Sequence, residues 1–148
     1  MVAKYPVKHI VLCVLVSLSV PVSADRLELR NQWVTLCEAQ TKETWRDNFL
    51  ACINAGNLTR ENLDTDKADD TVFLQYLRLE KAVTYYDKGC GFGQQQTCEK
   101  WSTYKKVTRN KKIEAEQSLD FLKKTMSENT LIANCAAIPG LCDYLAVR

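Results

Sequence analysis

The sequence predicts an all-α fold: a disulfide-stapled helical bundle of about five to six helices built from α/α hairpins. Apolar residues recur at helical spacing, and no stretch shows sustained alternation of apolar and polar residues. A single proline, Pro139, lies beyond residue 24. Six cysteines follow a leader-like N-terminus, and an even number behind such a segment is typical of disulfides formed in an oxidising compartment.

Residues 1–24 are interpreted as a secretory signal peptide. Two lysines make a short positive start, an apolar run extends from Ile10 to Val22, and small residues precede Asp25, where we expect cleavage. A membrane anchor is the alternative. It is disfavoured because the run has about thirteen residues, whereas a span needs about 20.

Removing 24 residues from 148 leaves a single predicted domain of 124 residues, 25–148. Lys4 and Lys8 leave with the signal peptide, so lysine plus arginine falls from 20 to 18 and equals the 18 acidic residues. A formally neutral chain has no global attraction to nucleic acid or membranes. His9, the single histidine, is also lost, and with it the commonest general base and metal ligand.

Stripes of apolar residues at helical spacing predict the helices. The clearest stripe lies between residues 72 and 86 and steps by four, three, four and three residues. Such stripes favour a packed core over a cofactor site. The stripes are Leu29, Trp33 and Leu36; Trp45, Phe49 and Cys52; Val72, Tyr76, Leu79, Val83 and Tyr86; and Ala115, Leu119, Leu122 and Met126.

Capping residues help to place the helix ends. Asp-Asp-Thr at 69–71 can cap the third helix and place negative charge at its start. Gly89 is expected to end that helix, and Gly56 and Gly140 to follow two others, because glycine accepts the left-handed conformation. Residues 56–70 are polar and are expected to form a loop. The predicted helices lie near 26–39, 44–55, 70–88, 95–109, 111–126 and 128–137, and the fourth and fifth can be one long helix.

The stretch DKGCGFGQQQTC (87–98) holds three of the five glycines. It predicts a tight reversal between two helices, since glycine accepts positive φ without steric cost. Cys90 and Cys98 flank the reversal, and a disulfide across so small a loop contributes about 2.5 kcal/mol in the chain-entropy picture. Cys135 and Cys142 form a second expected local bridge.

Residues 81–101, KAVTYYDKGCGFGQQQTCEKW, resemble one unit of the Sel1-like repeat family in its cysteine-rich secreted bacterial form. The resemblance implies α/α hairpins with a disulfide in each and a role as a protein-binding scaffold; some secreted members are linked to peptidoglycan or β-lactam binding. The positions that match the unit are Ala82, Tyr86, Lys88, Cys90, Gly93 and Cys98.

The resemblance covers 21 of the 124 residues and does not repeat in register along the chain. Arg60 stands where a second cysteine would follow LACINAGN (50–57), and the last two cysteines are seven rather than eight positions apart. A solenoid requires repeated units. We therefore expect a bundle with one hairpin of this type.

The pairing of Cys37 with Cys52 follows only by elimination, because six cysteines allow fifteen pairings. With a turn near 40–44, the two cysteines would lie roughly 9 Å out of register along the helix axes, too far for a relaxed bridge. Either the turn lies elsewhere or these cysteines have other partners. A structural zinc site is disfavoured because residues 25–148 have neither histidine nor closely spaced cysteine pairs.

Catalytic patterns are sparse. Without histidine or free thiols, Ser/His and Cys/His arrangements are excluded, and no motif supports Ser/Lys. Glu116 and Asp120 lie four apart on one helical face and could perform glycoside chemistry, although a solvated face is favoured. Asp64 and Asp66 fit the first positions of a calcium loop whose remaining positions do not match, so a helix-capping acidic loop is favoured. No metal or cofactor is expected.

A basic run interleaved with aromatic residues and free of acids is the predicted partner-binding site. Aromatic and cationic side chains together can bind nucleic acid or anionic glycans, but an exported protein is not expected to meet nucleic acid. A solvated helix face with the tryptophan turned inward is the alternative. Residues 61–70 carry five acids against Lys67, so docking or self-association through opposite charges is possible. The run comprises Lys100, Trp101, Tyr104, Lys105, Lys106, Arg109, Lys111 and Lys112.

We therefore expect a secreted protein, periplasmic if bacterial, that binds another protein, for example as an inhibitor or immunity-type protein against an envelope enzyme or toxin. It is not expected to be an enzyme or to keep a transmembrane anchor after cleavage. Two alternatives remain open: a carrier of small apolar ligands, and a cell-wall glycan hydrolase. Asn57-Leu58-Thr59 is a glycosylation sequon that matters only in a eukaryotic source.

Overall fold

The computed structural model describes residues 22–148, and most of the predicted signal peptide lies outside this part of the chain. Its helices confirm the expected all-α, disulfide-stapled fold, and no strand occurs among the described residues. None of the helices in this part of the chain combines the length and apolar character needed to span a bilayer. The elements are α1 (Val22–Ala39), η1 (Trp45–Asn48), α2 (Ala51–Thr59), η2 (Lys67–Asp69), α3 (Val72–Gly91), α4 (Gln95–Thr125), α5 (Glu128–Ala133), η3 (Cys135–Ala137) and α6 (Leu141–Val147).

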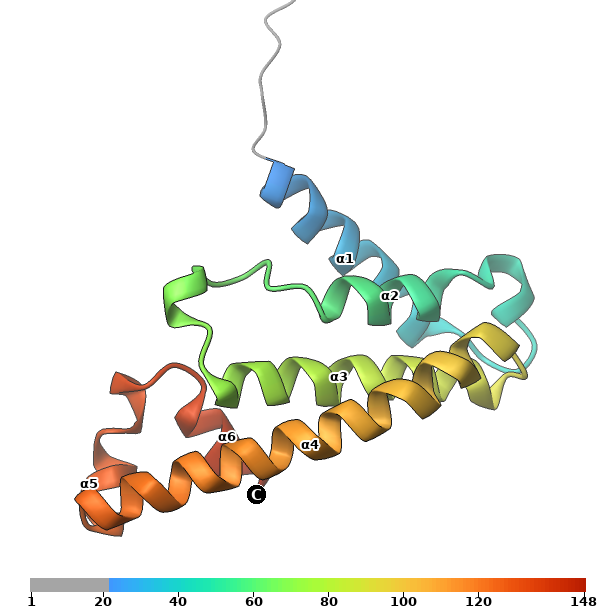
Figure 1. Ribbon diagram of the computed structural model, residues 1–148. Helices are drawn as coiled ribbons and strands as arrows, with labels where there is room; N and C mark the ends of the chain where they lie inside the picture. The colour runs from blue at the N-terminus through green and yellow to red at the C-terminus, as the bar shows by residue number, and fades with distance from the viewer. Residues whose placement is uncertain (1–21) are drawn as a thin grey trace, which may run out of the picture.

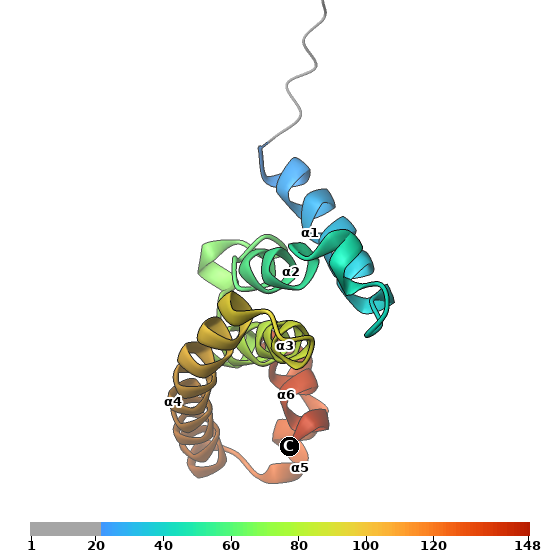
Figure 2. The ribbon, with the colours of Figure 1, turned by 90° about the vertical axis from the view of Figure 1, so that its right-hand side faces the viewer.

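Helix α3 is the central element of the bundle. Helix α2 lies along one side of α3, and the long helix α4 crosses its other side (Figure 1). Viewed from the end, α3, α4, α5 and α6 surround a common interior, while α2 and α1 stack outward from α3 (Figure 2). The two helical hairpins α1–α2 and α3–α4 therefore pack together mainly through α2 and α3.

Two hydrophobic clusters lie on opposite sides of α3. Of the residues of the predicted α3 stripe, Tyr76 belongs to the larger cluster, whereas the smaller cluster uses Tyr85, nine residues further on and outside the stripe. At about 100° per residue these two tyrosines project from opposite sides of the helix. The larger cluster joins α3 to α4, α5 and α6 and contains Phe73, Tyr76, Ala115, Leu119, Leu131, Leu141 and Tyr144; the smaller joins α1, α2 and α3 and contains Cys37, Ala51, Cys52, Ala55 and Tyr85.

Both expected local disulfides form, and so does the Cys37–Cys52 bridge that the sequence left open. Cys90–Cys98 and Cys135–Cys142 are local bridges with Cα–Cα distances of 4.5 and 5.0 Å. The third bridge, Cys37–Cys52, has a Cα–Cα distance of 4.7 Å.

The Cys37–Cys52 bridge forms because the chain reversal is longer than the sequence predicts. Helix α1 ends at Ala39 and α2 begins only at Ala51, with the 3-10 turn η1 between them. Each cysteine therefore lies within one turn of a facing helix end, and the axial mismatch expected from a turn near 40–44 does not arise.

Several predicted boundaries need correction. The second predicted helix, 44–55, is replaced by η1 and α2, and α2 runs on to Thr59. Gly56 lies inside α2 rather than after it, so the loop begins four residues later than predicted. The two segments 95–109 and 111–126 form the single helix α4, which contains no glycine or proline to interrupt it.

The C-terminal region also differs from the prediction. The segment 128–137 divides into α5 and η3, and helix α6 lies beyond every predicted helix. Gly140 has a φ of +79° and directly precedes α6 rather than closing the helix before it. The signal for α6 is present in the apolar residues Leu141, Tyr144 and Leu145, which have helical spacing, but the segment is only seven residues long.

Helix α3 ends two residues beyond its predicted end, whereas α4 begins at Gln95 as predicted. Helix α3 continues through Gly91, and the left-handed residue is Gly93, with a φ of +86°. Gly89 serves a different purpose, because a Cβ atom there would lie 2.7 Å from Cγ2 of the buried Thr97. The prediction that Gly89 ends the helix is therefore wrong, and Gly93 supplies the conformational freedom that the turn requires.

Candidate functional site

The basic run of the sequence lies on the N-terminal half of α4. Its outward part consists of Lys105, Lys106, Arg109 and Lys112, which we call the basic face. All four side chains are exposed, and none belongs to the ion pairs formed within residues 22–148. Lys105, Arg109 and Lys112 follow one another at spacings of four and three, so they form one stripe along the helix. The basic face is thus a continuous surface of a single sign.

Trp101 borders the basic face. Its side chain is half-buried, and Nζ of Lys105 lies 4.4 Å from the centroid of its ring. A cation over an indole face is attracted by the negative charge of the ring face. Trp101 therefore holds Lys105 in place and adds a flat apolar edge to the basic face.

The remaining members of the predicted partner-binding site lie elsewhere on α4. Tyr104 packs inward, with its ring 5.7 Å from that of Tyr86 and Cζ of Arg60 3.9 Å from its own centroid. Nζ of Lys111 bonds Oε2 of Glu114 at 2.6 Å, and Nζ of Lys100 lies 5.9 Å from the centroid of the Tyr104 ring. Tyr104 thus joins α4 to α2 and α3, whereas Lys100 and Lys111 make their contacts within α4. The basic face is the outward cationic part of the run.

Arg60 is a structural residue whose contacts the sequence does not predict. Its Nε donates to the hydroxyl of the fully buried Tyr86 at 3.0 Å, and another of its nitrogens donates to the hydroxyl of Tyr104. The Tyr86 hydroxyl donates in turn to Oδ1 of Asn57 at 2.7 Å. The network joins α2, α3 and α4. The sequon Asn57-Leu58-Thr59 lies in helix α2, where the side-chain amide of Asn57 is bonded to Tyr86 and Thr59 is buried.

The acidic segment 61–70 forms its ion pairs with arginines of α1 and α3 and none with the basic face. Glu61 pairs with Arg26 and Asp64 with Arg30, both from α1. Asp70 accepts two hydrogen bonds from Arg78 of α3, at 2.6 and 2.9 Å. Three of the five acids are therefore engaged by arginines. Within residues 22–148 no group of three or more acidic, cysteine or histidine side chains is placed to hold a metal ion.

Glu116 and Asp120 are exposed on α4, near two buried phenols. Burial raises the pKa of Tyr144, and the carboxylates of Glu116 and Asp120 add to this effect. Burial also raises the pKa of Tyr76, whose hydroxyl donates to Oε1 of Glu80 at 2.7 Å. Both phenols therefore stay protonated at neutral pH, and neither supplies a nucleophilic phenolate beside the two carboxylates.

The buried tyrosines predict a loss of stability at alkaline pH. Burial, with Glu38 nearby, raises the pKa of Tyr85 to about 12, and burial also raises that of Tyr86. The unfolded phenols ionise near pH 10 (about 10 for free tyrosine), so the folded state binds these protons more tightly. Their stabilising contribution is complete below about pH 10 and is lost as the pH rises from there.

Urea unfolding followed from about pH 9 to about pH 12 measures this effect. We expect the midpoint to fall steadily above about pH 10, with phenolate absorbance appearing mainly as the protein unfolds. A midpoint that stays constant across this range would contradict the burial of these tyrosines.

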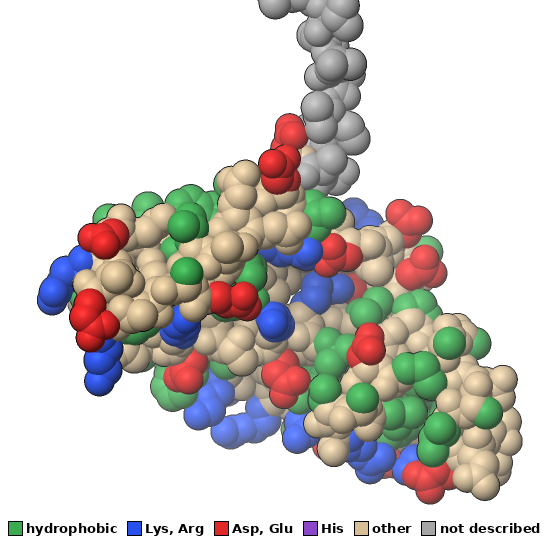
Figure 3. Space-filling model, turned by 180° about the vertical axis from the view of Figure 1, so that it is seen from behind, with side chains coloured by type: hydrophobic (Ala, Val, Ile, Leu, Met, Phe, Trp, Pro, Cys, Tyr) green, Lys and Arg blue, Asp and Glu red, His purple; other side chains and the backbone are tan. Residues whose placement is uncertain are grey.

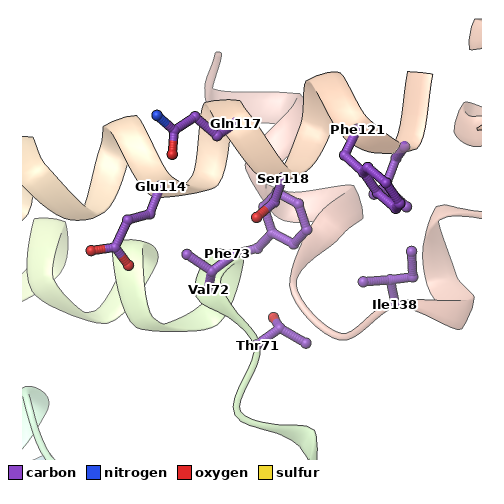
Figure 4. A pocket seen from close by; sticks show the side chains of 9 residues that line it. Thr71, Val72, Phe73, Glu114, Gln117, Ser118, Phe121 and Ile138 are labelled. Atoms are coloured by element: carbon purple, nitrogen blue, oxygen red, sulfur yellow. The ribbon is translucent and has the colours of Figure 1, made fainter. Parts of the chain in front are cut away.

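Several cavities open on the surface of the described residues, and two of them bear on function. The larger, of about 630 Å³, is a groove between the start of α3 and the second half of α4, and Figure 4 shows the side chains that line it. The smaller, of about 380 Å³, lies between η1, α2 and the start of α4, and its apolar wall consists of Trp45, Phe49, Leu50 and Ile53. We call them the α3–α4 groove and the η1–α4 cavity.

Comparisons with known proteins do not indicate a family or a function for this chain. No family model matches the chain, and neither a curated protein nor a solved structure matches it. The functional assignment therefore depends on the surfaces described above.

Proposed function

We propose that this is a secreted helical protein-binding module, periplasmic if the source is bacterial, that binds an acidic surface of a partner protein through the basic face of α4. The observation that carries the proposal is the single-sign surface formed by Lys105, Lys106, Arg109 and Lys112, with no ion pair to any residue of 22–148. Complementary charge across an interface speeds association and selects the partner. Inhibition of an envelope enzyme or toxin is an activity that such a surface can perform.

The support beneath the basic face favours binding over a purely solvated role. The start of α4 is tied to α3 by Cys90–Cys98, and its second half is anchored by the fully buried Ala115 and Leu119. A helix held at both ends presents its side chains with little ordering left to occur, which lowers the entropic cost of association.

Two further observations support the proposal, the first for the compartment and the second for protein binding. Three disulfides suit a protein made in an oxidising compartment. The resemblance of residues 81–101 to a Sel1-like unit points to scaffolds that act by protein contact.

The proposal is tested by capturing a partner from an envelope or culture extract and measuring its affinity for three forms of the oxidised protein. The wild type is compared with the triple variant Lys106→Glu, Arg109→Glu, Lys112→Glu and with a control variant, Lys42→Glu, Lys67→Glu, Lys124→Glu. The control has the same change in charge at three exposed lysines outside the basic face.

We expect the basic-face variant to bind the captured protein at least about tenfold more weakly and the control to bind within about twofold of the wild type. Raising the salt from about 0.1 M to about 1 M shortens the screening length from about 10 Å to about 3 Å and should release the partner. Unchanged affinity of the basic-face variant, with its helical content intact, would refute the proposal.

A second candidate function is the transport of small apolar ligands, and the η1–α4 cavity favours it. Its volume of about 380 Å³ falls within the range of ligand sites, about 300–1,000 Å³. Saturable uptake of anilinonaphthalene sulfonate, abolished by Phe49→Glu, would favour the carrier function over the binding module.

A further inference from the structure

One end of the molecule exposes a surface that carries no charge. Residues 129–142, NTLIANCAAIPGLC, include no charged side chain in a chain of which 26% of residues are charged. They form most of α5, all of η3 and the start of α6. Ile132 is 56% exposed, and Ala133, Ala136 and Ala137 are exposed as well. Hydrophobic side chains gather over this end of the molecule when it is seen from behind (Figure 3).

The α3–α4 groove continues this surface. Ile138, which follows Ala137 directly, lines the groove together with Phe121 of α4, whose side chain is 66% exposed. Figure 4 shows Phe121 and Ile138 on facing walls of the groove. Glu114 also lines the groove, at the end away from Phe121 and Ile138. We call the uncharged part of the combined surface the apolar end; it comprises Phe121, Ile132, Ala133, Ala136, Ala137 and Ile138.

The apolar end is held rigidly and does not lie on a loose tail. Cys135–Cys142 closes the segment, and Leu131 and Leu141, 1% and 0% exposed, anchor it in the core. The hydroxyl of Thr71 donates to the carbonyl oxygen of Pro139 at 2.6 Å, which ties the segment to the start of α3. Ile132 therefore cannot turn inward without breaking these contacts. Exposed apolar surface of this kind marks a site of interaction.

We infer that the apolar end binds the apolar end of a second copy of this chain, so that the protein forms a two-fold symmetric dimer. In such a dimer the patch on one chain contacts the same patch on the other chain, so the two identical charge patterns must be compatible. A patch without charge meets this condition, because it buries no unpaired charge against its copy.

The surroundings of the patch and the net charge favour the same partner. The rim carries both signs, with Lys123 paired to Glu128 at 3.4 Å and with Lys124 and Asp143 exposed. The 18 basic and 18 acidic residues of 25–148 give two copies no net repulsion. The basic face, in contrast, would repel itself, so the two surfaces are suited to different partners.

The inference is tested by sedimentation equilibrium of the oxidised, exported protein from about 1 µM to about 1 mM, the range of weak and transient interfaces. The variants are Ile132→Lys and Phe121→Lys, and the matched control is Phe49→Lys. Phe49 is 58% exposed, close to the 66% of Phe121, but lies beside η1 at the other end of α3. The mean mass of the wild type is expected to rise from one chain to two.

We expect Ile132→Lys and Phe121→Lys each to weaken dimerisation at least about tenfold, because each would bury a lysine ammonium in an apolar contact. Phe49→Lys and the basic-face triple variant should dimerise like the wild type. A wild type that stays monomeric up to about 1 mM would overturn the inference, as would an Ile132→Lys variant that dimerises normally. Either result leaves the proposed binding through the basic face unaffected.

Discussion

Replacing Cys37 and Cys52 together with alanine is expected to lower the free energy of unfolding by about 3 kcal/mol. The bridge spans a sequence separation of 15 residues, and closing a loop of about 15 residues restricts the unfolded chain by about that amount. It is also the only disulfide that joins α1 to the rest of the described fold. Both sulfur atoms lie in the smaller hydrophobic cluster at 0% exposure, so their loss removes packing as well.

Urea unfolding of the oxidised protein measures this loss, and the double variant Cys135→Ala, Cys142→Ala is the comparison. Its loop spans 7 residues, for which the same treatment gives about 2.4 kcal/mol, and Cys142 is exposed. We expect the Cys37–Cys52 double variant to be clearly the less stable of the two. Equal or reversed losses would contradict the structural role assigned to the α1–α2 bridge.

Gly56→Ala is expected to destabilise the protein by up to about 2 kcal/mol, at a site where helix propensity alone predicts a gain. Alanine is favoured over glycine inside a helix by about 1 kcal/mol. A Cβ atom at Gly56, however, would lie 2.7 Å from Cζ and 2.8 Å from Cδ1 of Tyr86. Tyr86 is fully buried and its hydroxyl is held by Arg60 and Asn57, so the ring cannot move aside. Overpacking of this kind costs about 1–3 kcal/mol.

The matched control is Gly91→Ala, at the last residue of α3. A Cβ atom there meets nothing within 4 Å, and the residue does not have a positive φ. We expect its free energy of unfolding to stay the same or to rise by up to about 1 kcal/mol. Thermal or urea unfolding of the two variants side by side decides the matter; equal stability would mean that Tyr86 does not pack against α2 as described.

Tyr104 illustrates how far the sequence could define the candidate site. Helical spacing places it in the same run as the basic residues, so the sequence predicts one partner-binding site that includes the whole run. Helical spacing indicates which residues share a helix face, but it does not indicate which neighbouring element covers that face. Arg60, 44 positions away, stacks on Tyr104 and covers part of its ring. Similarly, the sequence shows the acids of 61–70, but it does not show that two of them pair with Arg26 and Arg30 of α1.

The sequence by itself determined the all-α class, most helical segments, the two local disulfides, the cationic run and the charge-free stretch 129–142, because each depends on residues within a few turns of one another. Tertiary packing alone decided the length of the reversal that brings Cys37 to Cys52, the burial of Gly56 against Tyr86 and the division of the basic run into inward and outward residues. These features depend on contacts between segments distant in the chain. Their free energies arise from shape and burial, which no local spacing encodes.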